Sequence, residues 1–164
     1  RHSYLWFVYG LGKVDRWDGD RWYAPVFDRR HNLNLVASQD FGDKKEWQVS
    51  ARWALGSGLP FTQSQGYYQS PNVNDGIYSD YITQNADQIS INYADLNEGR
   101  LPSYHRLDIS VKRTFNDVMG GDLDFTAGVT NVYSRENVFY INRLTGQRKN
   151  QLPFLPSISL DWKF

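Results

Sequence analysis

The last nine residues of the chain, PSISLDWKF, alternate strictly between polar and apolar side chains. Successive side chains of a β-strand point to opposite faces of a sheet, so a period of two residues predicts a strand with one apolar and one polar face. The apolar parity holds Ile158, Leu160, Trp162 and Phe164, and the polar parity holds Ser157, Ser159, Asp161 and Lys163. The sequence then ends on an aromatic residue, with no polar tail behind it.

The same alternation recurs in four earlier segments. These are residues 30–41, 46–56, 104–115 and 122–133. The clearest is 104–115, where Leu107, Ile109 and Val111 share one parity while Asp108 and Lys112 occupy the other. Residues 2–12 form a nearly continuous apolar and aromatic run of the length, about 9–11 residues, that a strand needs to cross a bilayer. Together with the last strand, these segments predict an all-β chain of about six antiparallel strands.

The predicted connections alternate between long and short. Residues 42–45 and 116–121 are short turns, whereas 13–29, 58–102 and 134–155 are long. In an antiparallel meander this order puts the two short turns at one end of the sheet and the three long loops at the other. We expect short additional strands inside the long loops, at 77–82, 88–93 and 137–142.

Composition excludes several classes of function. The 164 residues suit one domain, and a formal net charge of zero argues against a nucleic-acid surface. The absence of cysteine excludes a disulfide scaffold and any thiolate metal site. No run of about 20 apolar residues is present to form a transmembrane helix. The mean hydropathy of −0.62 is compatible with membrane strands, which expose only every second residue to lipid.

Two architectures share this alternation. A soluble sandwich turns its apolar face inward, whereas a membrane barrel turns it toward lipid and lines its lumen with the polar face. Strand length, loop asymmetry and the terminal aromatic residue favour the barrel. The alternative is a soluble all-β carbohydrate-binding module, which would have to bury Trp47, Trp53, Ile109 and Phe164. A self-contained eight-stranded barrel would need a further membrane hairpin inside the longest loop.

Several stretches, in the right order, resemble a known family. Residues 96–111 (LNEGRLPSYHRLDISV) carry the most specific part, and 54–62, 127–142 and 155–164 match further pieces. They resemble the C-terminal β-barrel region of TonB-dependent outer-membrane receptors, particularly those of the Bacteroidota. The resemblance spans essentially the whole chain.

This resemblance implies that residues 1–164 are the C-terminal portion of an antiparallel transmembrane barrel of about 22 strands, which encloses a plug domain. The chain begins at Arg1 without a signal segment, and we interpret its start as a cut. The plug and the N-terminal barrel strands would then lie outside this sequence. The implied location is the outer membrane of a Gram-negative cell, with the C-terminus in the periplasm.

The implied function is import of a scarce nutrient, which would be an iron chelate, a cobalamin or a glycan. The implied partners are outer-membrane lipid, the rest of the barrel with its plug, the TonB complex through the missing N-terminal part, and a surface lipoprotein lid by family analogy. The closing strand, through Ile158, Leu160, Trp162 and Phe164, resembles the signal read by the barrel-assembly machinery. We expect no enzyme activity, no catalytic residue, no cofactor and no nucleic-acid partner.

The loop aromatics are the candidate substrate-binding residues, because aromatic and amide groups together suit sugars and aromatic chelators. They are Trp17, Trp22, Tyr23, Tyr67, Tyr68, Tyr78 and Tyr81. The alternative is that they form an interfacial girdle or pack the loops together. Asp15, Asp18 and Asp20 hint at a calcium loop but lack the closing Glu of an EF-hand, so we predict a solvated loop and no metal site.

Overall fold

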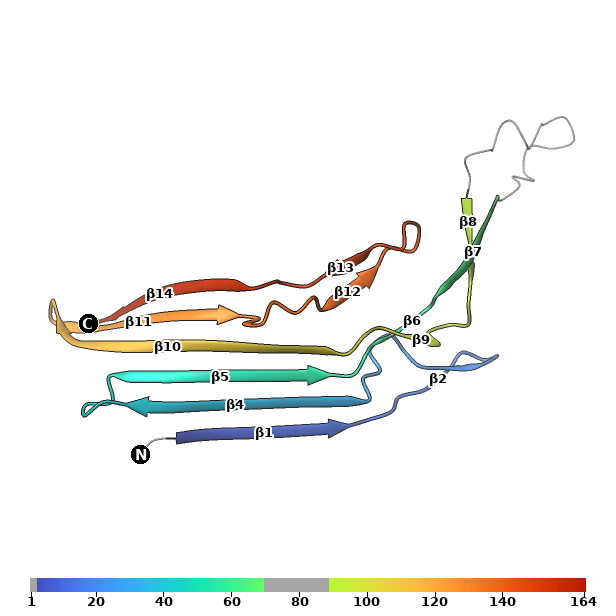
Figure 1. Cartoon of the computed structure of the whole chain (residues 1–164). Helices are drawn as coiled ribbons and strands as arrows, with labels where there is room; N and C mark the ends of the chain where they lie inside the picture. The colour runs from blue at the N-terminus through green and yellow to red at the C-terminus, as the bar shows by residue number, and fades with distance from the viewer. Residues whose placement is uncertain (1–2, 70–88) are drawn as a thin grey trace, which may run out of the picture.

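The structure is a computed structural model, and it describes residues 3–69 and 89–164. Six long strands form one antiparallel sheet in the order β1-β4-β5-β10-β11-β14, which is also their order in the chain (Figure 1). They are β1 (Ser3–Leu11), β4 (His31–Phe41), β5 (Trp47–Gly56), β10 (Tyr104–Val118), β11 (Gly121–Thr130) and β14 (Leu155–Lys163). The prediction of an all-β, antiparallel chain of about six strands is therefore confirmed.

Short strands pair in the long connections. They form four two-stranded sheets: β2 (Arg16–Trp17) with β3 (Trp22–Tyr23), β6 (Pro60–Phe61) with β9 (Gly99–Arg100), β7 (Ser64–Gln69) with β8 (Ile89–Tyr93), and β12 (Val138–Ile141) with β13 (Arg148–Asn150). The strands expected at 88–93 and 137–142 correspond to β8 and β12, while the one expected at 77–82 lies outside the described residues. Within the described ranges, no helix is long and apolar enough to cross a membrane.

The tight connections differ slightly from their predicted extent. Between β4 and β5, Gly42 adopts a φ of 90°, and the Lys45 amide donates to its carbonyl over 3.2 Å. The β10–β11 turn is shorter than the predicted 116–121, because β10 continues through a bulge to Val118 and only Met119 and Gly120 remain between the strands. Both lie at the left-hand end of the sheet in Figure 1, and the three long connections lie at the right-hand end.

The strand register places alternate residues of all six strands on the same face of the sheet. One row on the apolar face reads Leu5, Ala37, Ala51, Ile109 and Val129 in hydrogen-bonded neighbours. The adjacent row on the polar face reads Ser38, Ser50, Ser110, Gly128 and Ser157. The edge strand β1 departs from the pattern, because its polar parity carries Tyr4, Trp6 and Val8.

The apolar face lies uncovered in the part of the chain that the structure describes. No hydrophobic residue there is buried, and Leu5 and Ile158, at opposite edges of the sheet, are 72% and 73% exposed. On β10, Ile109 and Phe115 of the apolar face are exposed and Leu107 and Val111 are half-buried, as are Asp108 and Ser110 of the polar face. One layer of a soluble sandwich would instead bury its apolar face.

The polar face is hollowed instead. A depression of 190 Å³ includes Ser50, Ser110, Gly128 and Ser157 in its lining. Ion pairs lie on the same face, from Arg106 to Asp108 at 2.8 Å and from Lys163 to Asp124 at 3.0 Å. Asp124 is 7% exposed, so the better-shielded groups of this sheet are polar.

The sandwich alternative required four side chains to turn inward. Trp53 is half-buried, but Trp47, Ile109 and Phe164 are 39%, 36% and 99% exposed. The six-stranded sheet is open, since β1 and β14 are its two edges and do not pair with each other. The described residues thus form one open antiparallel sheet, with the smaller two-stranded sheets beyond one of its ends.

Candidate ligand pocket

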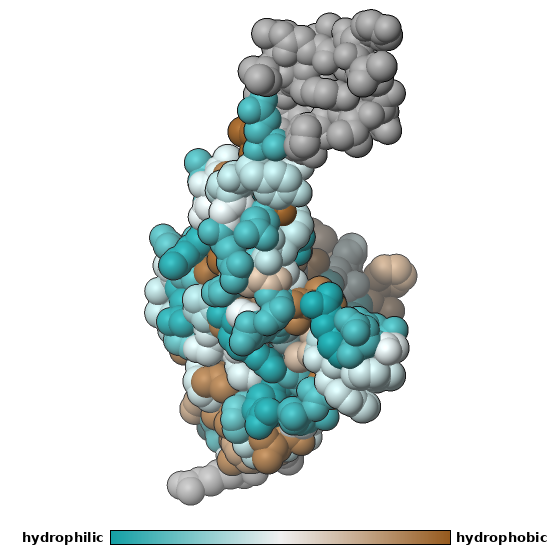
Figure 2. All heavy atoms as spheres, turned by 90° about the vertical axis from the view of Figure 1, so that its right-hand side faces the viewer, coloured by the Kyte–Doolittle hydropathy of each residue, from teal (hydrophilic) through white to brown (hydrophobic). Residues whose placement is uncertain are grey.

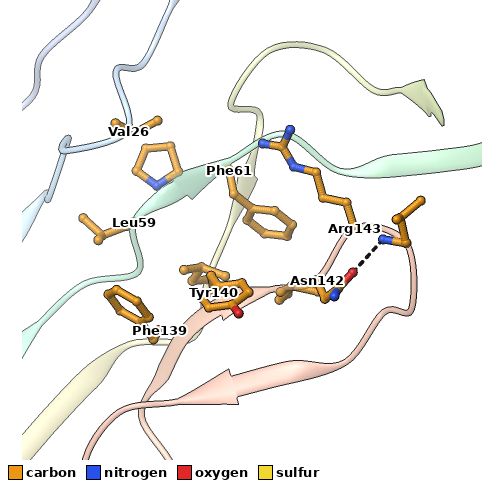
Figure 3. Close-up of a pocket in the computed structure, with 11 residues that line it drawn as sticks. Val26, Leu59, Phe61, Phe139, Tyr140, Asn142 and Arg143 are labelled. Atoms are coloured by element: carbon orange, nitrogen blue, oxygen red, sulfur yellow. Dashed lines mark hydrogen bonds between the residues drawn. The ribbon is translucent and has the colours of Figure 1, made fainter. Parts of the chain in front are cut away.

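The three long connections meet around one pocket of 630 Å³ (Figure 3). Val26 comes from the first connection, Leu59 and Phe61 from the second, and Phe139 and Arg143 from the third. The full lining is Val26, Leu59, Pro60, Phe61, Leu101, Phe139, Tyr140, Ile141, Asn142, Arg143 and Leu144. Viewed from this end, the molecule shows hydrophilic residues interspersed with hydrophobic ones (Figure 2).

The pairing of β6 with β9 builds one wall. Pro60 pairs with Arg100 and Phe61 with Gly99, and the Leu101 amide donates to the Leu59 carbonyl over 2.9 Å. Gly58 allows this approach, because a Cβ atom at that position would overlap the carbonyl oxygen of Leu101. The wall therefore depends on a glycine that precedes the strand.

A buried ion pair joins the first connection to the second. The Asp28 side chain is almost fully buried, and its carboxylate accepts from Arg100 Nη2 over 2.5 Å and from the Val14 amide over 3.0 Å. Arg100 also donates to the Asp28 carbonyl over 3.0 Å. The hydrogen bond from Arg100, helped by the Val14 amide, holds the pKa of Asp28 below its usual value against the opposing effect of burial.

Asn97 makes a second link between these two connections. Its side-chain amide donates to the Ala24 carbonyl over 2.9 Å, and its own backbone amide donates to Thr62 Oγ1 over 3.1 Å. Asn97 is 7% exposed and Thr62 is 8% exposed, so these bonds are shielded from water. Val26 is thus held between two anchored points, Ala24 and Asp28.

Asn131 anchors the third connection where β11 ends. It is fully buried and adopts a positive φ of 56°, which asparagine tolerates better than most residues. Its side chain donates to the Arg135 and Leu152 carbonyls over 2.9 and 3.0 Å and accepts from the Arg135 amide over 3.0 Å. The two ends of the connection are thereby tied to each other.

The β12–β13 hairpin is fixed against its neighbours on two sides. Asn137 accepts from the amide of His105 and donates to its carbonyl over 3.1 and 2.9 Å, which seats the start of the hairpin beside β10. At the other end, the Tyr67 hydroxyl donates to the Arg143 carbonyl over 2.5 Å. The Asn142 side chain accepts from the Leu144 amide over 2.9 Å, the bond drawn in Figure 3.

Arg143 supplies the positive charge of the site. It lines the main pocket and two adjoining hollows of 410 and 440 Å³. Its guanidinium lies 5.3 Å from the centre of the Tyr93 ring, and no carboxylate of the described residues forms an ion pair with it. The pocket therefore suits an apolar or aromatic group that carries a hydrogen-bond acceptor or an anionic substituent.

None of the described loop aromatics that we predicted to bind substrate lines the main pocket. Tyr67 lines the 410 Å³ hollow beside Arg143, but Trp17, Trp22, Tyr23 and Tyr68 line none of these three hollows. Trp17 and Trp22 face each other across the β2–β3 pair with ring centres 5.6 Å apart. Tyr78 and Tyr81 lie outside the described residues.

The sequence did not predict the residues that line the main pocket. Phe139 and Tyr140 lay in a predicted short strand, but nothing in the alternation pointed to a pocket. Leu59 and Phe61 become pocket residues through the β6–β9 pairing, which joins segments about 40 positions apart, and a local pattern does not encode that contact.

The acidic residues of the first connection make local contacts. Asp15 pairs with Lys13 at 2.7 Å, while Asp18 accepts from the amides of Asp20 and Arg21. The Arg21 and Asp20 amides lower the pKa of Asp18. No three potential metal ligands from His, Cys, Asp and Glu gather among the residues with described positions.

The proposed assembly-signal residues lie on the edge strand or just after it. Ile158, Leu160 and Trp162 belong to the exposed apolar face of β14, and Phe164 follows with its ring centre 5.7 Å from that of Trp162. The sequence matches no protein-family model, and neither the curated proteins nor the solved structures with which we compared the chain show a match.

Proposed function

We propose that this chain is the C-terminal part of the β-barrel of a TonB-dependent outer-membrane transporter. In this role the six-stranded sheet is a section of barrel wall, and the end with the tight connections faces the periplasm. The long connections lie outside the cell and contribute to substrate binding, and β14 is the closing strand. The transported nutrient belongs to one of the three classes that the resemblance implies: an iron chelate, a cobalamin or a glycan.

The observation that carries this proposal is the uncovered apolar face of the sheet. In the described part of the chain no hydrophobic residue of that face is buried and its edge residues Leu5 and Ile158 are more than two-thirds exposed, while the polar face is hollowed and holds ion pairs. In water, such an apolar face would favour association with other surfaces, but lipid covers it without a protein partner. The polar face then lines the lumen.

Strand length supports the same assignment. The 11 residues of β4 span ten residue steps, about 33 Å at about 3.3 Å per residue. A tilt of about 40° reduces this to about 25 Å along the membrane normal, which matches the apolar band of an outer-membrane barrel. The long connections at one end and tight turns at the other also follow the asymmetry of such barrels.

The pocket supports a role in ligand capture. All three long connections contribute to it, and buried links fix their bases: Asp28 to Arg100, Asn97 to Ala24, and Asn131 to Leu152. A preformed apolar site with one available cation reduces the ordering cost of binding. We place Arg143 and Phe61 at the centre of this binding surface.

The test uses the full-length protein in its own bacterium. The gene is deleted and restored as wild type, as Arg143→Ala, or as Arg148→Ala, a control on the same hairpin outside the pocket lining. Uptake of labelled ferric chelates, cobalamin and oligosaccharides is measured with and without an uncoupler of the proton gradient. We expect one class to lose energy-dependent uptake on deletion, and Arg143→Ala to reduce it at least fivefold while Arg148→Ala does not.

Two results would contradict the proposal. The first is recovery of the protein in the soluble fraction after cell breakage, with none in the outer membrane. The second is unchanged uptake of all three classes in the deletion strain.

A further inference from the structure

One charged side chain interrupts the apolar face. Among the strand-paired positions of that face, Arg113 on β10 is the only Asp, Glu, Lys or Arg. Its row is otherwise apolar and reads Phe41, Trp47, Arg113, Phe125 and Leu160 across five strands. A cation among these neighbours calls for an explanation that sheet packing does not supply.

Arg113 has aromatic neighbours and, among the described residues, no ion-pair partner. Its guanidinium carbon lies 4.8 Å from the centre of the Trp47 ring and 4.5 Å from that of Phe115. The residue is exposed, and its side chain makes no hydrogen bond or ion pair with any part of the chain whose structure is described. The two rings hold the guanidinium in place, and its N–H donors remain available to a ligand.

Arg113 also lies near the end of the sheet that carries the tight turns. Arg113 pairs with Trp47, which in turn pairs with Phe41 in the last row before the β4–β5 turn. That row is about 25 Å along the membrane normal from the row of His31 at the other end, by the strand rise and tilt used above. Tyr9 and His31 are hydrogen-bonded there, as are His105 and Tyr133. On β4 and β5 this row is the last of the apolar band, and on β10, β11 and β14 one further row follows, Phe115, Leu123 and Trp162. Arg113 therefore lies close to a boundary of the apolar band, where an arginine is far less costly than at its middle.

We propose that Arg113 binds the phosphodiester of a phospholipid at the periplasmic boundary of the membrane. This inference rests on the proposed function, since it requires the apolar face to contact lipid. A guanidinium presents a planar fork of N–H donors that matches two oxygens of a phosphate. Trp47 lies in the same row as Arg113 and Phe115 lies two residues nearer the β10–β11 turn, so both rings flank the headgroup, at a depth where aromatic rings are favoured.

Charge and geometry select this occupant over others. A protein partner for the row would need a carboxylate framed by apolar groups at the depth of the membrane boundary. A phospholipid supplies an anionic group directly above apolar chains, which is the same sequence of chemistry that the face shows from Arg113 toward Val111 and Ile109. A free phosphate would satisfy the guanidinium alone and would leave the apolar row uncovered.

The experiment compares lipid retention by variants of the full-length protein. Each protein is purified from outer membranes in a mild detergent, stripped of lipid, and titrated with dioleoylphosphatidylglycerol, and bound lipid is counted by native mass spectrometry. Dioleoylglycerol, which has the same chains without the phosphate, is the matched ligand. Arg113→Gln is compared with Arg113→Lys and with Lys112→Gln, which removes one positive charge from the neighbouring position on the polar face.

We expect Arg113→Gln to lower phosphatidylglycerol retention at least threefold relative to wild type. Lys112→Gln should bind as wild type does, and Arg113→Lys should fall between the two, because an ammonium lacks the planar fork. Dioleoylglycerol should bind all four proteins equally weakly. The heat-dependent gel mobility of each variant shows that it is folded.

Equal retention by Arg113→Gln and wild type would overturn the inference, as would equal losses in Arg113→Gln and Lys112→Gln. Inorganic phosphate that displaces the lipid at millimolar concentration would also overturn it, by showing a site for the free anion. If the protein purifies from the soluble fraction instead, the proposed function fails before this question arises. The two failures are therefore distinguishable.

Discussion

Asp28 and Arg100 are 72 positions apart in the sequence, yet they form the most shielded ion pair of the described structure. Asp28 follows the β2–β3 pair, and Arg100 is the last residue of β9. Their contact brings the first long connection against the second, and Val26 enters the pocket from the same short segment. One carboxylate therefore organises the pocket without lining it.

Acid should release the first connection. The pKa of Asp28 is lower in the folded protein than its usual value of 3.8, so the ion pair contributes fully above that value and is lost as the pH falls below it. Relative to an unstructured peptide digested in the same reaction, which corrects for the pH dependence of pepsin itself, we expect pepsin to cut within residues 13–30 faster at pH 2 than at pH 4.5. Asp28→Asn should abolish most of this difference, whereas Asp15→Asn, which removes an exposed carboxylate from the same connection, should preserve it. Identical profiles for Asp28→Asn and wild type would refute the role of the pair.

Asp28→Asn should also destabilise the loop end at neutral pH. Removal of one partner from a buried pair costs roughly 3–5 kcal/mol, and the lower end applies here because the Arg100 side chain is 38% exposed. Hydrogen exchange of the Val14 and Leu101 amides reports this opening locally. Exchange at the centre of β10 should stay unchanged, and a uniform increase over the whole sheet would show that the effect is not local.

Gly58→Ala should distort the β6–β9 wall. The added methyl group would overlap the Leu101 carbonyl, and relief of such a backbone contact typically costs about 1–3 kcal/mol. The matched control is Gly66→Ala, where the new methyl group would meet no atom within 4 Å. Thermal unfolding of the full-length variants in detergent should separate them, with a lower midpoint for Gly58→Ala alone. Equal midpoints would mean that the wall accommodates the methyl group.

Asn131→Ala should loosen the third connection. It removes the hydrogen bonds to the carbonyls of Arg135 and Leu152, at about 0.5–1.5 kcal/mol for each lost bond, and places alanine at a positive φ. We expect faster hydrogen exchange in residues 131–137 and weaker binding of the transported substrate. Asn131→Gly, which restores only the backbone freedom, should recover a small part of the loss. Full recovery by glycine would show that the side-chain bonds contribute nothing.

The isolated chain should aggregate in buffer. Its sheet has two open edges, and its apolar face carries large side chains such as Leu5 and Ile158 that are more than two-thirds exposed. Light scattering after dilution from denaturant measures this outcome, and detergent micelles should suppress it. A monomeric chain that unfolds cooperatively without detergent would exclude the membrane assignment.

The alternation of side chains was sufficient to predict five of the six long strands, and the apolar run of residues 2–12 predicted the sixth, β1. Ile158, Leu160 and Trp162 share the face predicted for them, because a period of two residues fixes the face once the strand exists. The extension of β10 to Val118 was missed, since the bulge after Phe115 breaks that period. The pocket was missed for a different reason. Phe61 is placed by the pairing of β6 with the distant β9, and Phe139 by the β12–β13 hairpin, which Asn137 holds beside β10; these strands have too few residues to show any period.

The alternation of tight and long connections places the turns that fix the sheet register at one end of the sheet and the pocket at the other. Gly42 and the Met119–Gly120 turn set the register of the sheet at one end, while every residue of the pocket lies beyond the other end. A change of length or sequence in the segment from β7 to β8 therefore leaves the pairing of β5 with β10 intact, because that ladder runs without interruption from Tyr104 to Arg113. Under the proposed function, such an architecture lets selection exchange the hairpins of the long connections without disturbing the sheet, and it makes the loop end the place to graft new specificity.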